Sequence, residues 1–159
     1  MKRTLNALCG FLLLAATAIA QPASPTTTPD TAASARSPAA SQQRTQLWLT
    51  VGTQRFAMTL EDSPTARAFV QLLPATFNMA DLNGNEKHVL LPRSLPTHPE
   101  RPDTIRTGDV MLYGDDTLVV FYETFRSNYR YTRIGRIAQS ADLARTLGSG
   151  GSHITFAMP

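Results

Sequence analysis

The stretch Asp81–Gly114, DLNGNEKHVLLPRSLPTHPERPDTIRTGDVMLYG, decides the fold of this chain. It joins two segments with strand patterns, the tight-turn dipeptide Asn83-Gly84, a proline-rich excursion and a Thr-Gly-Asp entry into another strand. A chain that reverses direction this often within so few residues favours a small β-barrel over a helical bundle or a doubly wound sheet.

The flanking sequence continues this pattern. Apolar residues alternate with others on both sides of Gly52-Thr53, which predicts a hairpin over 45–60. Further strands are expected at Phe77–Met79, Lys87–Leu91, Val110–Tyr113, Thr117–Tyr122, Tyr129–Ile137 and His153–Met158. The sequence therefore predicts a mainly β domain, residues 45–159, with a closed barrel of about eight strands.

Two short helices are expected to cap this barrel. The first is capped by Asp62 or Ser63 and is stopped by Pro74. The second begins at a Ser140 cap and ends at Gly148.

Residues 1–20 have the pattern of a signal peptide: a positive start, an apolar run and a small-residue site that ends at Ala20. Residues 21–44 are rich in Ala, Ser, Thr and Pro, which predicts a disordered linker. Two of the 15 basic residues, Lys2 and Arg3, lie in the leader, so its removal leaves 13 against 12 acidic residues. Cleavage would also remove Cys9, the one cysteine, and with it any disulfide.

Several runs together resemble the bacterial cyclophilin-like domain family: Asp62–Phe69, Leu72–Pro74, Asp81–Lys87, Gly108–Gly114 and Tyr131–Ile137. The resemblance covers nearly all of 45–158 and implies a closed barrel with a helix capping each end. It does not imply proline isomerase activity. Cyclophilins with that activity carry a Phe-His-Arg stretch, whereas His88 is followed here by Val89.

Aromatic residues and arginines are interleaved between Tyr122 and Arg136, as suits an acidic or planar ligand. Strand alternation predicts Tyr129, Tyr131 and Arg133 on one face and Arg136 on the other. The alternative is a solvated sheet face on which arginines pack over tyrosines.

The run from Asp81 to Lys87 is a polar turn that suits the rim of a pocket, or simply a hairpin built on Asn83-Gly84. Asp109 is expected to cap a turn or to accept hydrogen bonds from nearby backbone. A role as a catalytic acid is the alternative, but no second carboxylate has a spacing that would pair with it. The histidines have no metal-ligand spacing. Ser149 and Ser152 lie in a glycine-rich connection that lacks the features of a nucleophile elbow or a phosphate loop.

These patterns favour an exported, periplasmic or secreted, monomeric module that binds a small molecule or a peptide without catalysis. The alternatives are a prolyl isomerase or another enzyme, and an envelope interaction or chaperone-like module. No cofactor, no metal, no nucleic acid and no stable membrane insertion after cleavage are expected. The candidate binding residues are Asn78, Asp81, Glu86, Lys87, Tyr113, Tyr122, Tyr129, Tyr131, Arg133 and Arg136.

Overall fold

The computed structural model describes residues 45–148 and 150–159. The predicted leader (1–20) and linker (21–44), like Ser149, lie outside the described residues. Among the described helices, neither has the length and apolar character needed to cross a membrane.

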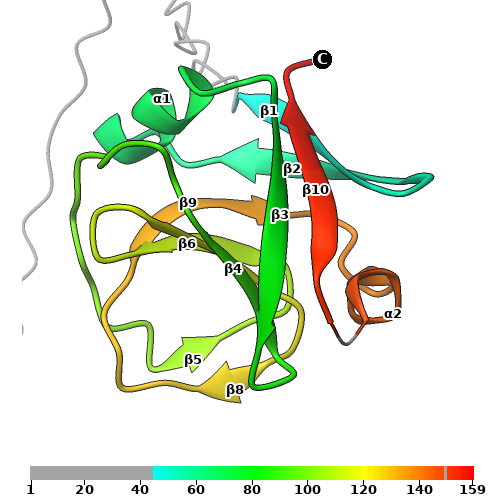
Figure 1. Ribbon diagram of the computed structural model, residues 1–159. Coiled ribbons are helices and arrows are strands. Elements are labelled where there is room, and N and C mark those ends of the chain that lie inside the picture. Colours follow the sequence, from blue (N-terminus) through cyan, green and yellow to red (C-terminus); the bar gives the residue numbers. More distant parts are fainter. Residues whose placement is uncertain (1–44, 149) are drawn as a thin grey trace, which may run out of the picture. The chain divides into compact units, whose positions relative to one another are not determined.

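Within the described residues, eight antiparallel strands close into a barrel in the order β1-β10-β3-β4-β7-β6-β9-β2 (Figure 1). This confirms the predicted fold class. The strands are β1 (Gln46–Val51), β2 (Gln54–Leu60), β3 (Ala75–Leu82), β4 (Glu86–Leu90), β6 (Asp109–Tyr113), β7 (Thr117–Phe121), β9 (Thr132–Ile137) and β10 (Ser152–Ala157).

The predicted turns lie at the expected positions. Asn83 and Gly84 have φ angles of 56° and 68°, the positive pair that a tight hairpin between β3 and β4 requires. Gly52, with φ of 56°, turns β1 into β2. These two hairpins fix the register of four of the barrel strands.

The helices α1 (Pro64–Val70) and α2 (Leu143–Leu147) add Ala66, Phe69, Leu143 and Leu147 to the barrel core. Ser63 caps α1 as predicted, since its hydroxyl accepts a hydrogen bond from the Ala66 amide at 3.1 Å. The prediction that Ser140 caps α2 was wrong: Asp142 is the N-cap, and Ser140 contributes only its backbone carbonyl to the Leu143 amide.

A small second sheet, β5 (Thr104–Ile105) with β8 (Phe125–Arg126), lies outside the barrel and was not predicted. Its strands are too short to carry a sequence pattern. The predicted strand from Tyr129 also begins later, at Thr132, and Tyr131 makes only an isolated bridge to Glu100. The segment before β9 therefore belongs to this outer sheet region.

Two apolar clusters lie on the two sides of the barrel wall. The interior cluster includes Leu118, Val120 and Tyr122 of the β7 segment. The outer cluster consists of Ile105, Met111, Val119, Phe121 and Tyr131, with Phe125 packed against it. The wall formed by β6 and β7 is thus covered on both faces, as its continuous apolar run predicts.

Strand β9 carries a bulge opposite β6. Val110 pairs with Gly135, but the next residue of β6, Met111, pairs with Arg133. One residue of β9 is therefore left over, which changes the alternation of its side chains. Gly135 is required here, because a Cβ atom would clash with the carbonyl oxygen of Thr59 and lie 2.8 Å from Cε of Met58.

Candidate functional site

The pleat of the barrel wall separates neighbouring residues of the polar turn. Lys87 pairs with Val120 and Asp81 pairs with Lys87, so all three point toward the interior cluster. Glu86 pairs with Phe121 of the outer cluster and therefore faces outward. The turn that looks like one polar group in the sequence thus divides between two environments.

Asp81, Lys87 and Tyr122 form one group inside the barrel, called here the interior polar cluster. The fully buried Lys87 ammonium donates to Oδ1 of Asp81 at 2.7 Å and to the carbonyl oxygens of Gly148, at 2.8 Å, and Gly150. The Tyr122 hydroxyl donates to the same Asp81 oxygen at 2.5 Å. The Lys87 ammonium also lies 5.2 Å from the Tyr122 ring centre.

These contacts explain the ionisation of the interior polar cluster. The hydrogen bond from Lys87, followed by that from Tyr122, lowers the pKa of the Asp81 carboxyl. Burial, followed by the hydrogen bond to Asp81, raises the pKa of the Tyr122 hydroxyl. With its donors and acceptors paired to one another, the cluster fastens the segment after α2 to the barrel and presents no free group for a ligand.

Arg133 and Arg136 approach the buried carboxylate of Asp109 from the same face. The Nη1 atom of Arg136 lies 3.0 Å from Oδ1 of Asp109, and that of Arg133 lies 3.7 Å from it. The second Asp109 oxygen accepts the Arg106 amide at 2.9 Å, so Asp109 closes a turn. The prediction that Arg133 and Arg136 lie on opposite faces was wrong, because the β9 bulge shifts the alternation between them.

Asn78 lies apart from both groups. It is exposed on β3 and pairs with His153 of β10. Its side-chain oxygen lies beside Gly151, where an added Cβ atom would be 3.7 Å from it. No described contact joins Asn78 to the other candidate residues.

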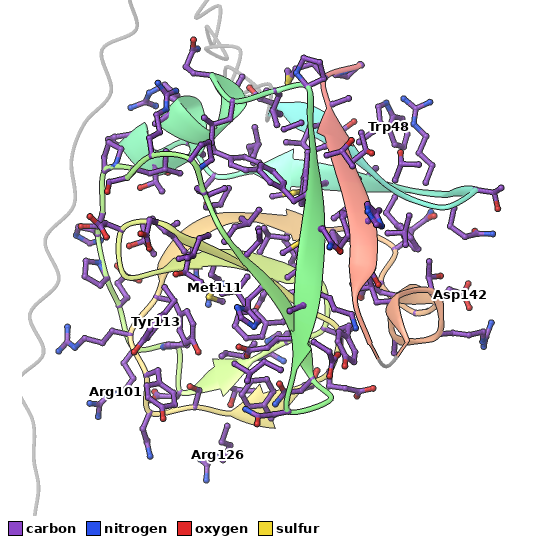
Figure 2. All side chains as sticks on the ribbon, in the orientation of Figure 1. Trp48, Arg101, Met111, Tyr113, Arg126 and Asp142 are labelled. Atoms are coloured by element: carbon purple, nitrogen blue, oxygen red, sulfur yellow. The ribbon has the colours of Figure 1, made fainter. Side chains whose placement is uncertain are left out.

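The remaining candidates, Glu86, Tyr113, Tyr129 and Tyr131, lie together around a cavity of about 420 Å³ on the outer wall, called here the outer pocket. Figure 2 shows Tyr113 on the side of the barrel away from Trp48. The outer pocket is lined by Leu82, Asn83, Asn85, Glu86, His88, Tyr113, Thr117, Val119, Phe125, Tyr129 and Tyr131.

Glu86 distinguishes this pocket chemically. The residue is 7% exposed, and among the described residues its carboxyl has no ion-pair partner and no hydrogen-bond donor. Its oxygens are not sealed, so they remain accessible from the pocket. Burial, followed by the charge of Asp81, raises its pKa to about 7. The pKa of the nearby Tyr131 hydroxyl rises to about 12 through burial and then the charge of Glu86.

Aromatic rings form the wall and rim of the outer pocket. The ring centre of Tyr113 lies 6.1 Å from that of Tyr129 and 5.6 Å from that of Tyr131. Tyr113 and Tyr129 are 47% and 63% exposed, and Leu82 beside them is 42% exposed. Exposed apolar side chains gathered at a cavity mark an interaction surface more often than isolated ones do.

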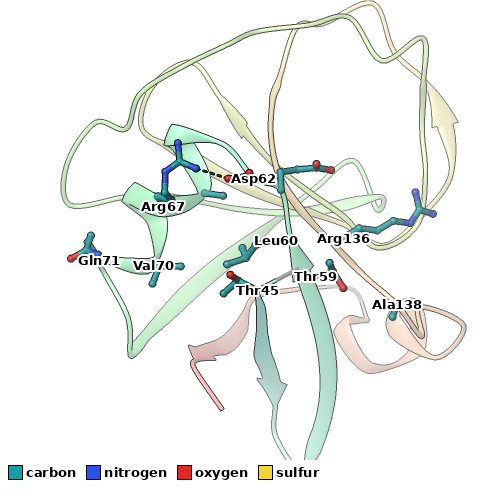
Figure 3. A pocket seen from close by; sticks show the side chains of 11 residues that line it. Thr45, Thr59, Leu60, Asp62, Arg67, Val70, Gln71, Arg136 and Ala138 are labelled. Atoms are coloured by element: carbon teal, nitrogen blue, oxygen red, sulfur yellow. Dashed lines mark hydrogen bonds and ion pairs between the residues drawn. The ribbon is translucent and has the colours of Figure 1, made fainter. Parts of the chain in front are cut away.

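A larger cavity of about 900 Å³ lies between α1 and the neighbouring strands and is shown in Figure 3. Three of its four charged residues have partners, since Arg67 pairs with Asp62 at 2.6 Å and Arg136 pairs with Asp109. The fourth, Glu61, is an exposed residue at the surface. It also lacks aromatic residues among its described lining. The outer pocket is therefore the better candidate site, although it is smaller.

The sequence identified the pocket's acid and tyrosines but not the residues between them. His88 and Val119 line the outer pocket and were not among the candidates. A signal was present, because Glu86 and His88 are two residues apart on one strand and so share a face. Phe125 comes from β8, which was not predicted. Within the described residues, no group of three or more histidines, cysteines or carboxylates is placed to hold a metal ion.

Comparisons with known proteins address the domain as a whole. The sequence profile described as the cyclophilin-like family matches residues 49–157. The fold is similar to the solution structure of a hypothetical protein from Archaeoglobus fulgidus, with 19% identity and a TM-score of 0.50. That similarity covers 73% of this chain and 95% of the archaeal one. The comparison with curated proteins found no match.

Proposed function

The chain belongs to the cyclophilin-like family, and from this premise we propose that its barrel is a ligand-binding module whose site is the outer pocket. One observation carries the proposal: the carboxyl of Glu86, a residue only 7% exposed, has no described partner and lies in a cavity walled by tyrosines. A buried polar group without a partner is costly. A ligand that supplies the missing partner would recover that cost.

The pocket's dimensions agree with this function. A cavity of about 420 Å³ lies within the usual range for small-molecule sites, which is about 300 to 1,000 Å³. Apolar and aromatic walls with few polar groups are also typical of such sites. A small molecule, or one or two residues of a peptide, would fit.

The proposed module acts outside the cytoplasm. The support is the leader pattern of residues 1–20 and the spacer composition of residues 21–44. Expression of the full chain in a bacterium, with fractionation and mass measurement, tests this part. Recovery of the intact leader in the cytoplasmic fraction would oppose it.

Prolyl isomerisation is the rival activity. It requires a donor such as arginine beside a hydrophobic groove, and the described lining of the outer pocket contains no arginine. A protease-coupled assay with an Ala-Pro peptide separates the two functions. We expect the uncatalysed rate at micromolar protein, and an accelerated rate would favour the enzyme.

Binding is tested by NMR of the full chain with a library of metabolites and dipeptides. Ligands are expected to shift the amide signals of Glu86, His88 and Tyr113. Thr117→Phe should fill the pocket and abolish these shifts, whereas Gln71→Phe, at the rim of the larger cavity, should leave them unchanged. If no compound shifts the pocket signals of the folded protein, or if all shifts map to Gln71, the proposal fails.

A further inference from the structure

We propose that the outer pocket takes a protonated organic amine, whose ammonium group pairs with Glu86 while its apolar body packs against the surrounding tyrosine rings. The inference rests on the outer pocket being the binding site proposed above. It adds the charge and chemical class of the ligand.

The pairing of two other carboxylates, those of Asp81 and Asp109, provides the first support. Asp81, half-buried, has the ammonium of Lys87 at 2.7 Å. Asp109, fully buried, has the guanidinium of Arg136 at 3.0 Å. Glu86 is 7% exposed, against 1% for Asp109, and no described lysine or arginine forms an ion pair with it. Because buried carboxylates are normally paired with cations, the missing partner of Glu86 is a positive charge.

The aromatic walls favour the same charge. Tyr113 is in edge contact with Tyr129, with an interplanar angle of 89°, and tilts by 53° from Tyr131. The three rings therefore differ in orientation, and all three line the pocket. Aromatic faces carry partial negative charge and attract cations, most strongly where water is excluded.

Hydrogen bonding to the Glu86 carboxyl favours an amine with N–H donors over other organic cations. Asn85 lines the outer pocket, and its side-chain carbonyl oxygen is buried without a hydrogen-bond partner in the described structure. That oxygen is closed to solvent, so the Glu86 carboxyl is the acceptor that a ligand in the pocket reaches. A primary ammonium group supplies three donors, whereas a quaternary ammonium group supplies none.

Proton exchange gives the proposal a second readout. Burial and the charge of Asp81 raise the pKa of Glu86 to about 7, and a bound ammonium group would favour its ionised form. Binding at pH 7 should therefore release a fraction of a proton, and affinity should increase between pH 6 and pH 8. The titratable groups around Glu86 are His88, Tyr113, Tyr129 and Tyr131 in the outer pocket. Asp81 and Tyr122 act on it from the other side of the barrel wall.

The experiment compares three probes with one ring and different head groups: benzylamine, benzyl alcohol and benzoate. Calorimetry and NMR with the full chain at pH 8 should show binding of benzylamine at least about tenfold tighter than of the other two. Glu86→Gln should abolish this preference, and Tyr129→Ala, at an exposed ring, should weaken benzylamine about fivefold. Glu123→Gln, which removes an exposed carboxylate nearby, should change neither.

Two results would overturn the inference. One is equal or tighter binding of benzyl alcohol or benzoate in the outer pocket, which leaves the binding function intact but rejects the amine. The other is retention of the benzylamine preference in Glu86→Gln. If no probe and no member of the wider library shifts the pocket signals, both the inference and the proposed function are rejected.

Discussion

Replacing Glu86 with glutamine should stabilise the folded chain at pH 8 by about 3 kcal/mol and leave its stability at pH 4 nearly unchanged. The residue is 7% exposed, its carboxyl has no described partner, and burial raises the carboxyl pKa from 4.5 to about 7. At about 1.4 kcal/mol for each pH unit, this difference corresponds to roughly 3 kcal/mol. Glutamine keeps the shape of the protonated acid and cannot ionise.

The sign of the stability change follows because Glu86 binds its proton more tightly in the folded state than in the unfolded state. Below pH 4.5, Glu86 is protonated in both the folded and unfolded states and adds no penalty. Between pH 4.5 and about 7 the unfolded state loses the proton first, so the folded state becomes progressively less stable. Above pH 7 the penalty is complete, and it is this penalty that the glutamine variant lacks.

Urea unfolding followed by the fluorescence of Trp48, the one tryptophan of the chain, measures the effect at several pH values. Glu123→Gln is the matched control, since it removes one carboxylate from an exposed position. A stability difference between Glu86→Gln and the parent that stays constant from pH 4 to pH 8.5 would refute the reasoning. So would a glutamine variant that is less stable than the parent at pH 8.

Five further substitutions test the rest of the barrel by the same unfolding assay. Lys87→Met should lower the free energy of unfolding by about 3 kcal/mol, because it leaves a carboxylate and two backbone carbonyls without their donor. A decrease below about 1 kcal/mol would contradict the role of the interior polar cluster. Arg136→Gln should lower the free energy of unfolding by about 1 to 2 kcal/mol, and Arg133→Gln by less than about 0.5 kcal/mol. Both arginines approach the buried Asp109, but only Arg136 donates a hydrogen bond to it. The reverse order would show that the bulge is misplaced. Gly135→Ala should lower the free energy of unfolding by about 2 to 3 kcal/mol, because the added Cβ atom clashes with the backbone. Gly151→Ala is the control and should change it little, since the nearest atom to its added Cβ atom is 3.6 Å away. Similar decreases in both variants would argue against the clash.

The barrel could be predicted because its signals are local. The Asn83-Gly84 turn and the alternation along β1 and β2 each specify structure within a few residues. The outer sheet could not be predicted in this way, since β5 and β8 have two residues each and pair across a long separation in sequence. Their position depends on the apolar cluster that they cover, which is a tertiary effect.

The bulge shows a different limit. Alternation is reliable only while each residue of a strand has one partner, and β9 has an extra residue opposite β6. Arg133 and Arg136 therefore reach the same aspartate, although their spacing of three predicts opposite faces. Gly135 in the middle of a strand pattern was the available sign, because an isolated glycine there often marks a bulge.

The alternation of side chains along a strand does predict the feature on which the candidate site depends, which is that Glu86 and Lys87 point to opposite faces of β4. Glu86 and Lys87 are adjacent in sequence and opposite in charge, which makes them look like one polar unit, yet adjacent strand residues point to opposite faces. Lys87 is therefore directed to Asp81 inside the barrel and is unavailable to Glu86 outside it. If the two side chains shared a face, they would neutralise each other and the outer wall would carry no unpaired acid. Because Glu86 and Lys87 lie on opposite sides of the wall, the outer pocket retains an unpaired carboxyl that can bind a ligand.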